Sequence, residues 1–382
     1  MIKILDFSPY YPPRIGGMEK YAGELHENLA KKNCQITAFV PLIPKSAQKL
    51  ETKPGITIVR YPACEVISNY PLPCFWQKEF WRQRKKLSQD KYDIVTSTVR
   101  FFVQPIMACF FAKKHKIPLL HIEHGSDFVK HTFLVSLIAK TFDKTIGHFI
   151  LSKADQLIAP SQSAANFIKL LSGRKAPVIY RGMPFKEIDA VPPENNLRRQ
   201  FPDKKIIVYM GRLIYGKGII HLLEAVRLLN RSDIVLLVVG EGPERKKLEE
   251  YAREYNLTKQ IIFPGSVPFS EAISILKISD IFVNPSYNEG LPTSVLEAGT
   301  CKKAIIATNV GGTPEIITHN KSGIIIEPYD TEAIRNSIEK LIDDPKLRDT
   351  LGKNAREEIE QKFNWENSAN AYLKEINSLL KK

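Results

Sequence analysis

Residues 281–299 read IFVNPSYNEGLPTSVLEAG, and this stretch decides the fold. The apolar run 281–284 predicts a buried strand, and a Pro-containing exit ends it. Pro292 suits the first turn of the next helix, where its missing N–H is not needed. Glu289 is therefore expected in the loop after the strand, and Glu297 one to two turns inside the helix.

The two glutamates flank backbone that suits a phosphate. Free N–H groups and the positive end of a helix dipole are expected between Glu289 and Glu297. A carboxylate on each side of a phosphate fits a nucleotide-sugar, with one for hydroxyls of the transferred sugar and one for the ribose diol. The same pattern would arise from one acidic residue at a helix N-terminus and one solvated acidic residue inside the helix. The rest of the chain has to distinguish these two interpretations.

Around this stretch, apolar runs alternate with helical patterns, which is typical of parallel α/β sheets. Two sets of strands are expected, on either side of a Pro- and Asn-rich connection at 184–202. The first set comprises 3–7, 35–39, 56–61, 94–97, 118–123, 156–159 and 178–180. The second set comprises 205–210, 235–239, 260–263, 281–284, 304–308 and 323–326. The pattern predicts two doubly wound domains with a ligand cleft at the carboxyl ends of the strands.

Charged or glycine-rich loops follow the first strand of each half. Arg212 and Lys217 place a planar guanidinium and a mobile ammonium group before a helix. Together these two cations are suited to bind a diphosphate. Gly16 and Gly17 would let backbone amides approach a phosphate closely. His124, at the carboxyl end of a strand, could hydrogen-bond a sugar or stabilise developing charge. Taken singly, each feature has an ordinary alternative: a solvated charged loop for Arg212 and Lys217, a plain tight turn for Gly16 and Gly17, and a structural histidine for His124.

In this order, the motifs resemble the retaining glycosyltransferases of family 4, the glycosyl transferases group 1, which have the GT-B fold. The resemblance runs nearly end to end and includes VGEGP at 239–243 and ATNVGGTPE at 307–315. It implies two Rossmann-like domains facing across a cleft. Residues 1–183 would bind the acceptor, residues 184–364 would bind the nucleotide-sugar, and the helix 365–382 would cross back to the N-terminal domain.

The resemblance implies how the donor is held. Arg212 and Lys217 would hold the diphosphate, and Gly16 and Gly17 would form the loop whose amide, that of Gly17, reaches it. Glu297 would take the ribose hydroxyls. The co-substrate would be a nucleotide-diphosphate sugar, for which UDP is the commonest choice among relatives. No other cofactor is expected, and the absence of a D-x-D motif predicts no divalent metal.

The resemblance also implies where the chemistry occurs. His124 would line the donor sugar near the reacting carbon, and Glu289 would sit beside the transferred sugar; both are predicted catalytic residues. Gly290 and Leu291 would contribute amides, and the base would rest near Val267. Front-face attack would retain the anomeric configuration, with the leaving phosphate accepting the proton, so no carboxylate nucleophile is assigned.

Composition indicates a globular protein of the cytosol. The 382 residues are 43% hydrophobic and 25% charged, which are ordinary globular values. No apolar run approaches the roughly 18 residues of a membrane span. The N-terminus reads as a strand rather than a signal peptide. Five scattered cysteines without a C-x-x-C pair indicate reduced thiols and argue against a structural metal site.

Positive charge is concentrated in the first half of the chain. Residues 1–180 hold 26 Lys and Arg against 13 Asp and Glu, whereas residues 181–382 hold 29 against 28. Such asymmetry usually reflects an anionic partner, although lysines kept for solubility would look the same. By the resemblance, this basic half is the acceptor half.

Two segments of the basic half predict contact with an anionic membrane surface. Residues 75–87, FWQKEFWRQRKKL, mix aromatic and basic side chains as an interfacial helix does. Residues 128–152 predict a helix with many apolar residues among lysines, for which packing in the core is the alternative. We expect a glycan or lipid-linked acceptor in cell-surface polysaccharide or lipid glycan biosynthesis. The expected location is the cytoplasm, with peripheral association at the inner face of the membrane.

Two other classes of function fit parts of the pattern. A nucleotide-sugar epimerase or a phosphorylase-like enzyme can share the two-domain plan, so fold alone does not exclude either. A basic protein that binds nucleic acid or membrane is the non-enzymatic alternative. No recognised nucleic-acid motif accompanies the charge, and no nucleic-acid partner is expected.

Overall fold

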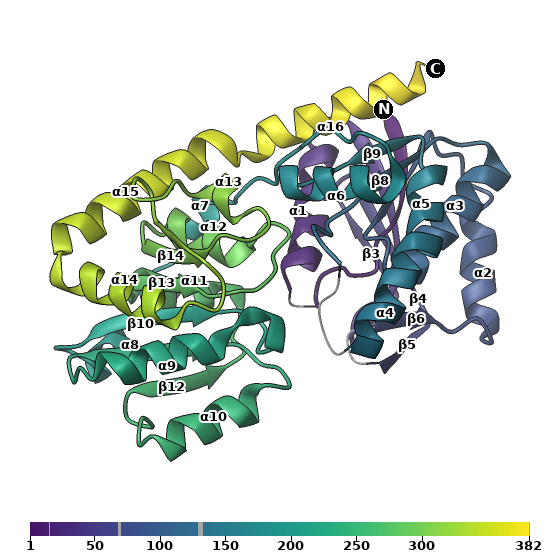
Figure 1. Cartoon of the computed structure of the whole chain (residues 1–382). Coiled ribbons are helices and arrows are strands. Elements are labelled where there is room, and N and C mark those ends of the chain that lie inside the picture. The colour runs from purple at the N-terminus through teal and green to yellow at the C-terminus, as the bar shows by residue number, and fades with distance from the viewer. Residues whose placement is uncertain (15, 68–69, 129–132, 382) are drawn as a thin grey trace. The chain divides into compact units, whose positions relative to one another are not determined.

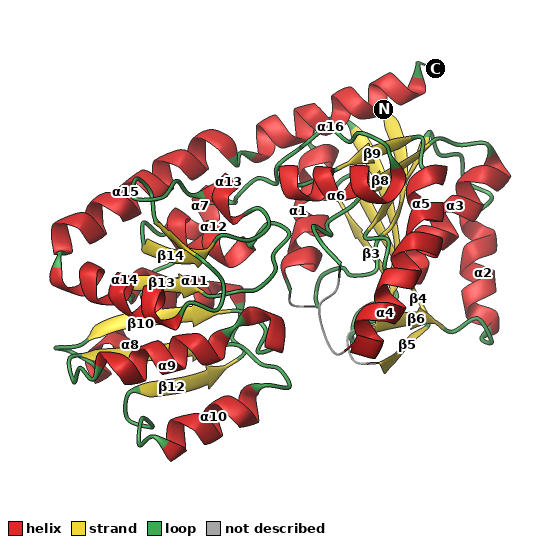
Figure 2. Ribbon diagram, viewed as in Figure 1, coloured by secondary structure: helices red, strands yellow, loops and turns green. Residues whose placement is uncertain are grey.

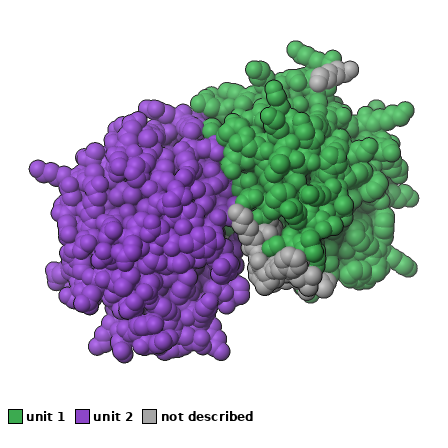
Figure 3. Space-filling view, in the orientation of Figure 1, with its two compact units in different colours: residues 1–182, 365–382 green, residues 183–364 purple. Residues whose placement is uncertain are grey.

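The computed structural model describes residues 1–14, 16–67, 70–128 and 133–381. It divides into two compact units, coloured separately in Figure 3. Unit 1 comprises residues 1–182 and 365–382, and unit 2 comprises residues 183–364. Both units are mixed α/β structures in which helices cover a sheet (Figure 2).

Unit 1 is built on a seven-stranded sheet with the order β3-β4-β2-β1-β7-β8-β9. All neighbouring strands are parallel except β3, which pairs antiparallel with β4. A separate antiparallel hairpin joins β5 to β6. The strands are β1 (Ile2–Phe7), β2 (Cys34–Pro41), β3 (Leu50–Lys53), β4 (Ile56–Tyr61), β5 (Ala63–Ile67), β6 (Tyr70–Pro73), β7 (Ile94–Thr98), β8 (Leu119–Ile122) and β9 (Gln156–Ile158).

Alternate residues of this sheet face two different cores, as the period of a strand requires. Ile4 packs with α1 and α16 on one face, whereas Leu5 packs with α3, α5 and α6 on the other. The last helix thus completes the core of unit 1. The helices of this unit are α1 (Gly17–Ala30), α2 (Lys78–Leu87), α3 (Val103–His115), α4 (Phe133–Phe142), the π-helix η1 (Asp143–Gly147), α5 (His148–Lys153), α6 (Gln162–Ser172) and α16 (Trp365–Leu380).

Unit 2 is built on a six-stranded parallel sheet with the order β12-β11-β10-β13-β14-β15. Its strands are β10 (Lys205–Met210), β11 (Ile234–Val239), β12 (Ile261–Gly265), β13 (Ile281–Asn284), β14 (Ala304–Thr308) and β15 (Ile324–Ile326). Its helices are α7 (Phe185–Ala190), α8 (Asn195–Gln200), the 3-10 turn η2 (Tyr215–Lys217), α9 (Ile219–Leu229), α10 (Arg245–Glu254), α11 (Phe269–Ile278), α12 (Thr293–Thr300), α13 (Thr313–Ile316), α14 (Thr331–Asp343) and α15 (Pro345–Lys362). The central strands are buried on both faces, which explains their continuous apolar sequences.

Several details differ from the sequence expectations, among them the strands β3, β5 and β6, which were not predicted. The expected strand at 178–180 is wrong: Val178 forms a single bridge to Ala159, and the preceding Pro177 has no N–H to extend a ladder. The connection at 184–202, for which no secondary structure was predicted, contains α7 and α8. The helix expected from residue 128 begins at Phe133 among the described residues, and part of that expectation falls on 129–132, outside them.

Candidate functional site

In unit 2, two loops meet at the carboxyl edge of the sheet. Because β10 and β13 are parallel neighbours, the loops that follow them leave the sheet side by side. The backbone N–H of Tyr287 donates to the carbonyl of Gly216 over 2.9 Å and joins the loops directly. This edge carries the predicted residues Arg212, Lys217 and Glu289.

Lys217 and Glu289 form the centre of this edge. The Lys217 Nζ lies 2.6 Å from the Glu289 Oε1. The same oxygen accepts hydrogen bonds from the Ser286 hydroxyl at 2.7 Å and the Asn284 amide at 3.2 Å. Burial alone would raise the pKa of Glu289, but Lys217 and these hydrogen bonds outweigh burial and hold the pKa below its usual value. Glu289 is therefore an ionised, buried and fixed carboxylate.

Two glycines in left-handed backbone conformations keep these loops in place. Gly218 has φ of 61°, and a Cβ there would come within 2.2 Å of the Pro285 carbonyl oxygen. Gly311 has φ of 54°, and a Cβ there would come within 1.6 Å of the Glu289 carbonyl oxygen. Side chains at these positions would both strain the backbone and push the loop of Glu289 away.

The remaining predicted residues of unit 2 lie around the same loops or further along the sheet. The Arg212 side chain is exposed, and its carbonyl accepts a hydrogen bond from the Tyr209 hydroxyl at 3.1 Å. Gly290 and Leu291 lie in the turn before α12, and the Gly290 carbonyl accepts from the Gly312 N–H at 2.9 Å. Glu297 is half-buried in the second turn of α12.

Val267, the predicted neighbour of the base, lies in the loop between β12 and α11 and is half-buried. The sheet order separates this loop from that of Glu289, because β12 is followed by β11, β10 and then β13. Within unit 2, the structure thus brings Lys217 into contact with Glu289 and leaves Val267 on a different loop of the sheet.

His124 belongs to unit 1 and follows the end of β8. It is half-buried, and the ring of Tyr21 stands edge-on to it with 4.7 Å between ring centroids. Burial lowers the pKa of His124 to about 4, Arg181 adds to this shift, and the Glu123 carboxylate opposes it. The imidazole is consequently neutral near pH 7, with one ring nitrogen able to donate a hydrogen bond and the other able to accept one.

A buried charged cluster that sequence reasoning missed holds the loop of His124. Glu123 accepts from the Gly125 N–H at 2.6 Å and pairs with the Arg100 Nη1 at 2.8 Å. The Arg100 Nε also donates to Asp143 at 2.9 Å, within the π-helix η1. Glu123 ends an apolar strand, and a charge so placed needs a partner, but nothing in the sequence identifies Arg100 as that partner.

The glycines of the first loop lie at the start of α1. Gly17 is the first residue of the helix, and Gly16 precedes it in extended backbone. The buried carboxylate of Glu19 folds back over this turn, so that a Cβ on Gly16 would come within 2.2 Å of the Glu19 Oε2. Arg14 pairs with Glu19 at 3.2 Å. Gly16 therefore leaves room for a side chain of the helix that it precedes.

Metal clusters and membrane-spanning helices are both missing from the described part of the chain. In residues 1–14, 16–67, 70–128 and 133–381, no group of three or more His, Cys, Asp or Glu residues is placed to hold a metal ion. Within those same ranges, no helix combines the length and apolar character needed to cross a membrane.

Sequence comparison gives matches in both units. The family model of the glycosyltransferase family 4 matches residues 15–186, and that of the glycosyl transferases group 1 matches residues 194–358. An uncharacterised glycosyltransferase of Methanocaldococcus jannaschii is 36% identical over 383 residues, covering 98% of this chain and 97% of the relative.

Solved structures give the same picture of the fold. Sucrose-phosphate synthase of Thermosynechococcus elongatus has a TM-score of 0.81 at 22% identity, with all of both chains covered. HepE of Anabaena in complex with UDP-glucose has a TM-score of 0.78 at 17% identity, covering 99% of this chain and 100% of that one. These similarities show the fold of the chain.

Proposed function

We propose that this chain, which belongs to the family 4 (group 1) glycosyltransferases, transfers a hexosyl-type sugar from a nucleotide-diphosphate sugar with retention of anomeric configuration. It is a glycosyltransferase of the GT-B fold. The proposed acceptor is a glycan or a lipid-linked sugar of cell-surface polysaccharide or lipid glycan biosynthesis.

The contact between Lys217 and Glu289 carries this proposal. It places a mobile cation and a fixed carboxylate 2.6 Å apart at the carboxyl edge of a parallel sheet, where nucleotides bind to such sheets. The ammonium is suited to a diphosphate oxygen and the carboxylate to sugar hydroxyls. Arg212 is proposed to add a second cation, and Glu297 to accept from the ribose hydroxyls. Gly16 and Gly17 remain the proposed loop on unit 1 for that diphosphate, and Val267 the proposed neighbour of the base.

The proposed reaction separates charge, and the site is suited to stabilise it. As the bond from the anomeric carbon to the phosphate oxygen breaks, its electron pair stays on the diphosphate. The acceptor oxygen attacks the same face of the sugar and gives its proton to that phosphate. Lys217 and Arg212 stabilise the growing negative charge without a metal, and the amides of Gly290 and Leu291 contribute to this. One well-aimed donor of this kind commonly contributes about 3–4 kcal/mol. Glu289 and neutral His124 line the sugar.

Product analysis tests this function. The enzyme is incubated with UDP-, GDP- and ADP-sugars and a panel of lipid-linked and soluble glycan acceptors. We expect nucleoside diphosphate release that depends on acceptor, and a product whose anomeric proton keeps the donor's configuration by NMR. An inverted product would contradict retention. Interconversion of the donor without acceptor would instead identify an epimerase.

A surface of unit 1 supports a lipid-linked acceptor. The helical segment α4–η1–α5 exposes Leu137, Ile138, Ile146 and Phe149, with Ile138 62% exposed. Phe110 of α3, 57% exposed, lies 6.5 Å from Phe149 between ring centroids. We call these five side chains the apolar face; α4, α5 and α3 are labelled in Figure 1.

Charge around the apolar face favours an anionic lipid. Lys140, Lys144 and Lys153 are exposed along the same segment, whereas its acidic residue Asp143 is buried against Arg100. Exposed apolar side chains among cations are typical of an interfacial helix on an anionic bilayer. Trp76, 71% exposed, and Trp81 at the start of the basic helix α2 add a second region of this type. We therefore propose a cytoplasmic enzyme that associates peripherally with the inner face of the membrane.

Liposome sedimentation tests the membrane proposal. Binding is expected to need anionic lipid, to weaken with salt, and to fall in the double variant Ile138→Ser/Phe149→Ser. Leu228→Ser, which changes an exposed leucine of unit 2, is the matched control and should bind as the wild type does. Binding that is indifferent to lipid charge and to the double variant would contradict the proposal.

A further inference from the structure

We propose that Tyr21 and Tyr372 are positioning residues, through which the last helix of the chain holds His124 in place for the reaction. The inference rests on the proposed function, because it gives His124 a task at the transferred sugar. It assigns a role in turnover to α16, a helix that the sequence indicates only as part of the fold.

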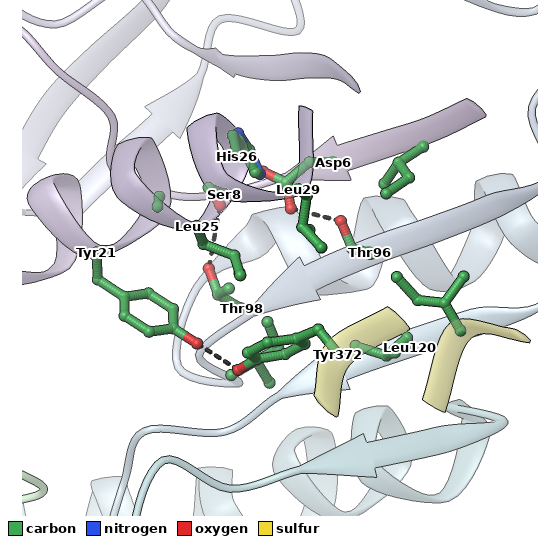
Figure 4. A pocket seen from close by; sticks show the side chains of 14 residues that line it. Asp6, Ser8, Tyr21, Leu25, His26, Leu29, Thr96, Thr98, Leu120 and Tyr372 are labelled. Carbon is green, nitrogen blue, oxygen red and sulfur yellow. Dashed lines mark hydrogen bonds and ion pairs between the residues drawn. The ribbon is translucent and has the colours of Figure 1, made fainter. Parts of the chain in front are cut away.

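Tyr21 links His124 to the last helix. Its ring, on α1, stands edge-on to the imidazole at an interplanar angle of 83°, an arrangement that aromatic pairs prefer. Its hydroxyl is hydrogen-bonded to the hydroxyl of Tyr372 on α16. Figure 4 shows the two side chains pointing toward each other from their helices. Residues 124, 21 and 372 are thus joined by direct contacts.

The hydrogen bond between the two hydroxyls positions the side chains and does not serve as an acid–base pair. Tyr372 is 1% exposed and Tyr21 is 3% exposed. Burial raises the pKa of Tyr372 well above its usual value and also raises that of Tyr21, so both phenols keep their protons. A buried hydroxyl that loses its hydrogen bond is unfavourable, so each tyrosine favours the position in which it meets the other.

A second set of contacts holds α16 against α1 on the same side. The Glu24 carboxylate of α1 accepts from the Arg181 Nη2 at 2.7 Å and from the Trp365 indole at 3.2 Å. The Trp365 and Tyr21 ring centroids are 5.9 Å apart. Because these contacts fix the start of α16, losing the Tyr372 hydroxyl should release Tyr21 without detaching the helix.

A small cavity gives Tyr21 room to move once it is released. It has a volume of about 20 Å3 and is lined by Tyr21 and Tyr372 together with polar side chains that include Asp6, Ser8 and Thr98 (Figure 4). Its volume is about that of one water molecule, and apolar side chains such as Leu25 and Leu120 make up most of its lining. Among the described residues, the Asp6 Oδ2 that lines it has no hydrogen-bond partner. The tyrosine pair therefore borders a space that lets a ring without its hydrogen bond shift slightly and change its contact with His124.

Hydroxyl deletion tests the inference. Each of the variants Tyr372→Phe and Tyr21→Phe removes one of the two hydrogen-bonded hydroxyls and keeps both rings. We expect each to lower kcat about 3–10-fold with little change in donor KM, as loss of one neutral hydrogen bond implies. The double variant should be no slower than the slower single variant, because both break the same contact.

Tyr11→Phe is the matched control. It removes a buried tyrosine hydroxyl from the same core, one whose hydrogen bond, at 3.0 Å, is to the His26 Nδ1. Its kcat should equal that of the wild type. Equal kcat losses in Tyr11→Phe and Tyr372→Phe, or additive losses in the double variant, would overturn the inference.

A readout independent of activity separates this inference from the proposed function. The ring 1H–13C resonance of His124, assigned with His124→Asn, should shift in Tyr372→Phe and Tyr21→Phe but not in Tyr11→Phe. An unmoved resonance in both variants overturns the positioning role, even if the enzyme transfers sugar. A moved resonance in an enzyme that transfers no sugar upholds the coupling of α16 to His124 and refutes the proposed function.

Discussion

At the scale of single residues, the charge of Lys217 is the feature most directly open to test. Its ammonium is held by Glu289 and is proposed to bind the donor diphosphate. Lys217→Met should raise the donor Kd roughly 10–100-fold, because a hydrogen bond to a charged group contributes about 1.5–3 kcal/mol. Titration calorimetry measures this.

The control for Lys217 is Lys246→Met, which removes an exposed lysine of α10 in the same unit. Its donor Kd should match that of the wild type. Equal affinities in Lys217→Met and the wild type would place the diphosphate elsewhere.

The low pKa of His124 predicts that the stability of the protein depends on pH. The folded protein holds this pKa at about 4 through burial, with Glu123 opposing the shift, Arg181 and His121 favouring the neutral form, and Tyr21 covering one side. The unfolded chain takes up the same proton near the usual value of about 6.5. The contribution of neutral His124 to the free energy of unfolding is therefore fully present above pH 6.5. It is lost as the pH falls toward 4.

NMR titration and unfolding measure this behaviour. The His124 ring should titrate near pH 4, and urea unfolding from pH 7 to 5 should cost the wild type more stability than it costs His124→Asn. A midpoint near 6.5, or parallel losses in the two proteins, would show that the imidazole is solvated like an ordinary surface histidine.

The residues that could be predicted from the sequence are those whose position depends on near neighbours along the chain. Glu289 and Glu297 are separated by one loop and one helix start, so their placement follows from the strand and from Pro292. Arg100 and Asp143 lie 43 positions apart and meet only through tertiary packing around the π-helix η1. Tyr21 and Tyr372 are 351 positions apart. No spacing in a single sequence indicates such pairs.

At the scale of elements, strong apolar runs were predictable and marginal ones were not. The predicted bounds of the buried strands of unit 2 agree with the observed bounds to within one or two residues. These strands are buried on both faces, so their sequences are continuous apolar runs that are easy to recognise. The strand β3, LETK, is largely exposed and has no such signal. At 178–180 the run was apolar enough, but its geometry allowed only one bridge.

The loop after β14 makes a prediction at this scale. Gly311→Ala should lower stability and weaken donor binding, because its Cβ would meet the Glu289 carbonyl at 1.6 Å. Left-handed backbone alone costs an alanine about 1–2 kcal/mol. Thermal unfolding and donor titration measure the two effects.

Comparison with Gly173→Ala separates the steric part of that effect from the backbone part. Gly173 has φ of 72°, and a Cβ added there would meet nothing within 4 Å, so its substitution carries the backbone cost alone. Gly311→Ala should be clearly less stable than Gly173→Ala, and only Gly311→Ala should bind donor more weakly. Equal behaviour of the two variants would show that Gly311 does not brace the loop of Glu289.

At the scale of the whole molecule, the chain combines a basic unit with a nearly neutral one. The two-sheet plan was predictable from the alternation of strands and helices, and the family match and solved structures confirm the GT-B fold. The identity of the sugar, base and acceptor was not predictable, since these depend on loop shapes that one sequence does not fix. The mix of basic and aromatic residues indicated the proposed membrane partner, and the apolar face on α3, α4, η1 and α5 adds structural support to it.

The measurement that tests the account most directly is thermal stabilisation by a panel of UDP-, GDP- and ADP-sugars without metal. We predict that one nucleotide family, expected to be UDP, raises the Tm of the wild type. Glu297→Ala should abolish the effect, whereas Glu249→Ala, which removes a half-buried helix carboxylate of α10, should keep it. Stabilisation by no member of the panel, or equal stabilisation in Glu297→Ala, would contradict the donor site proposed for unit 2.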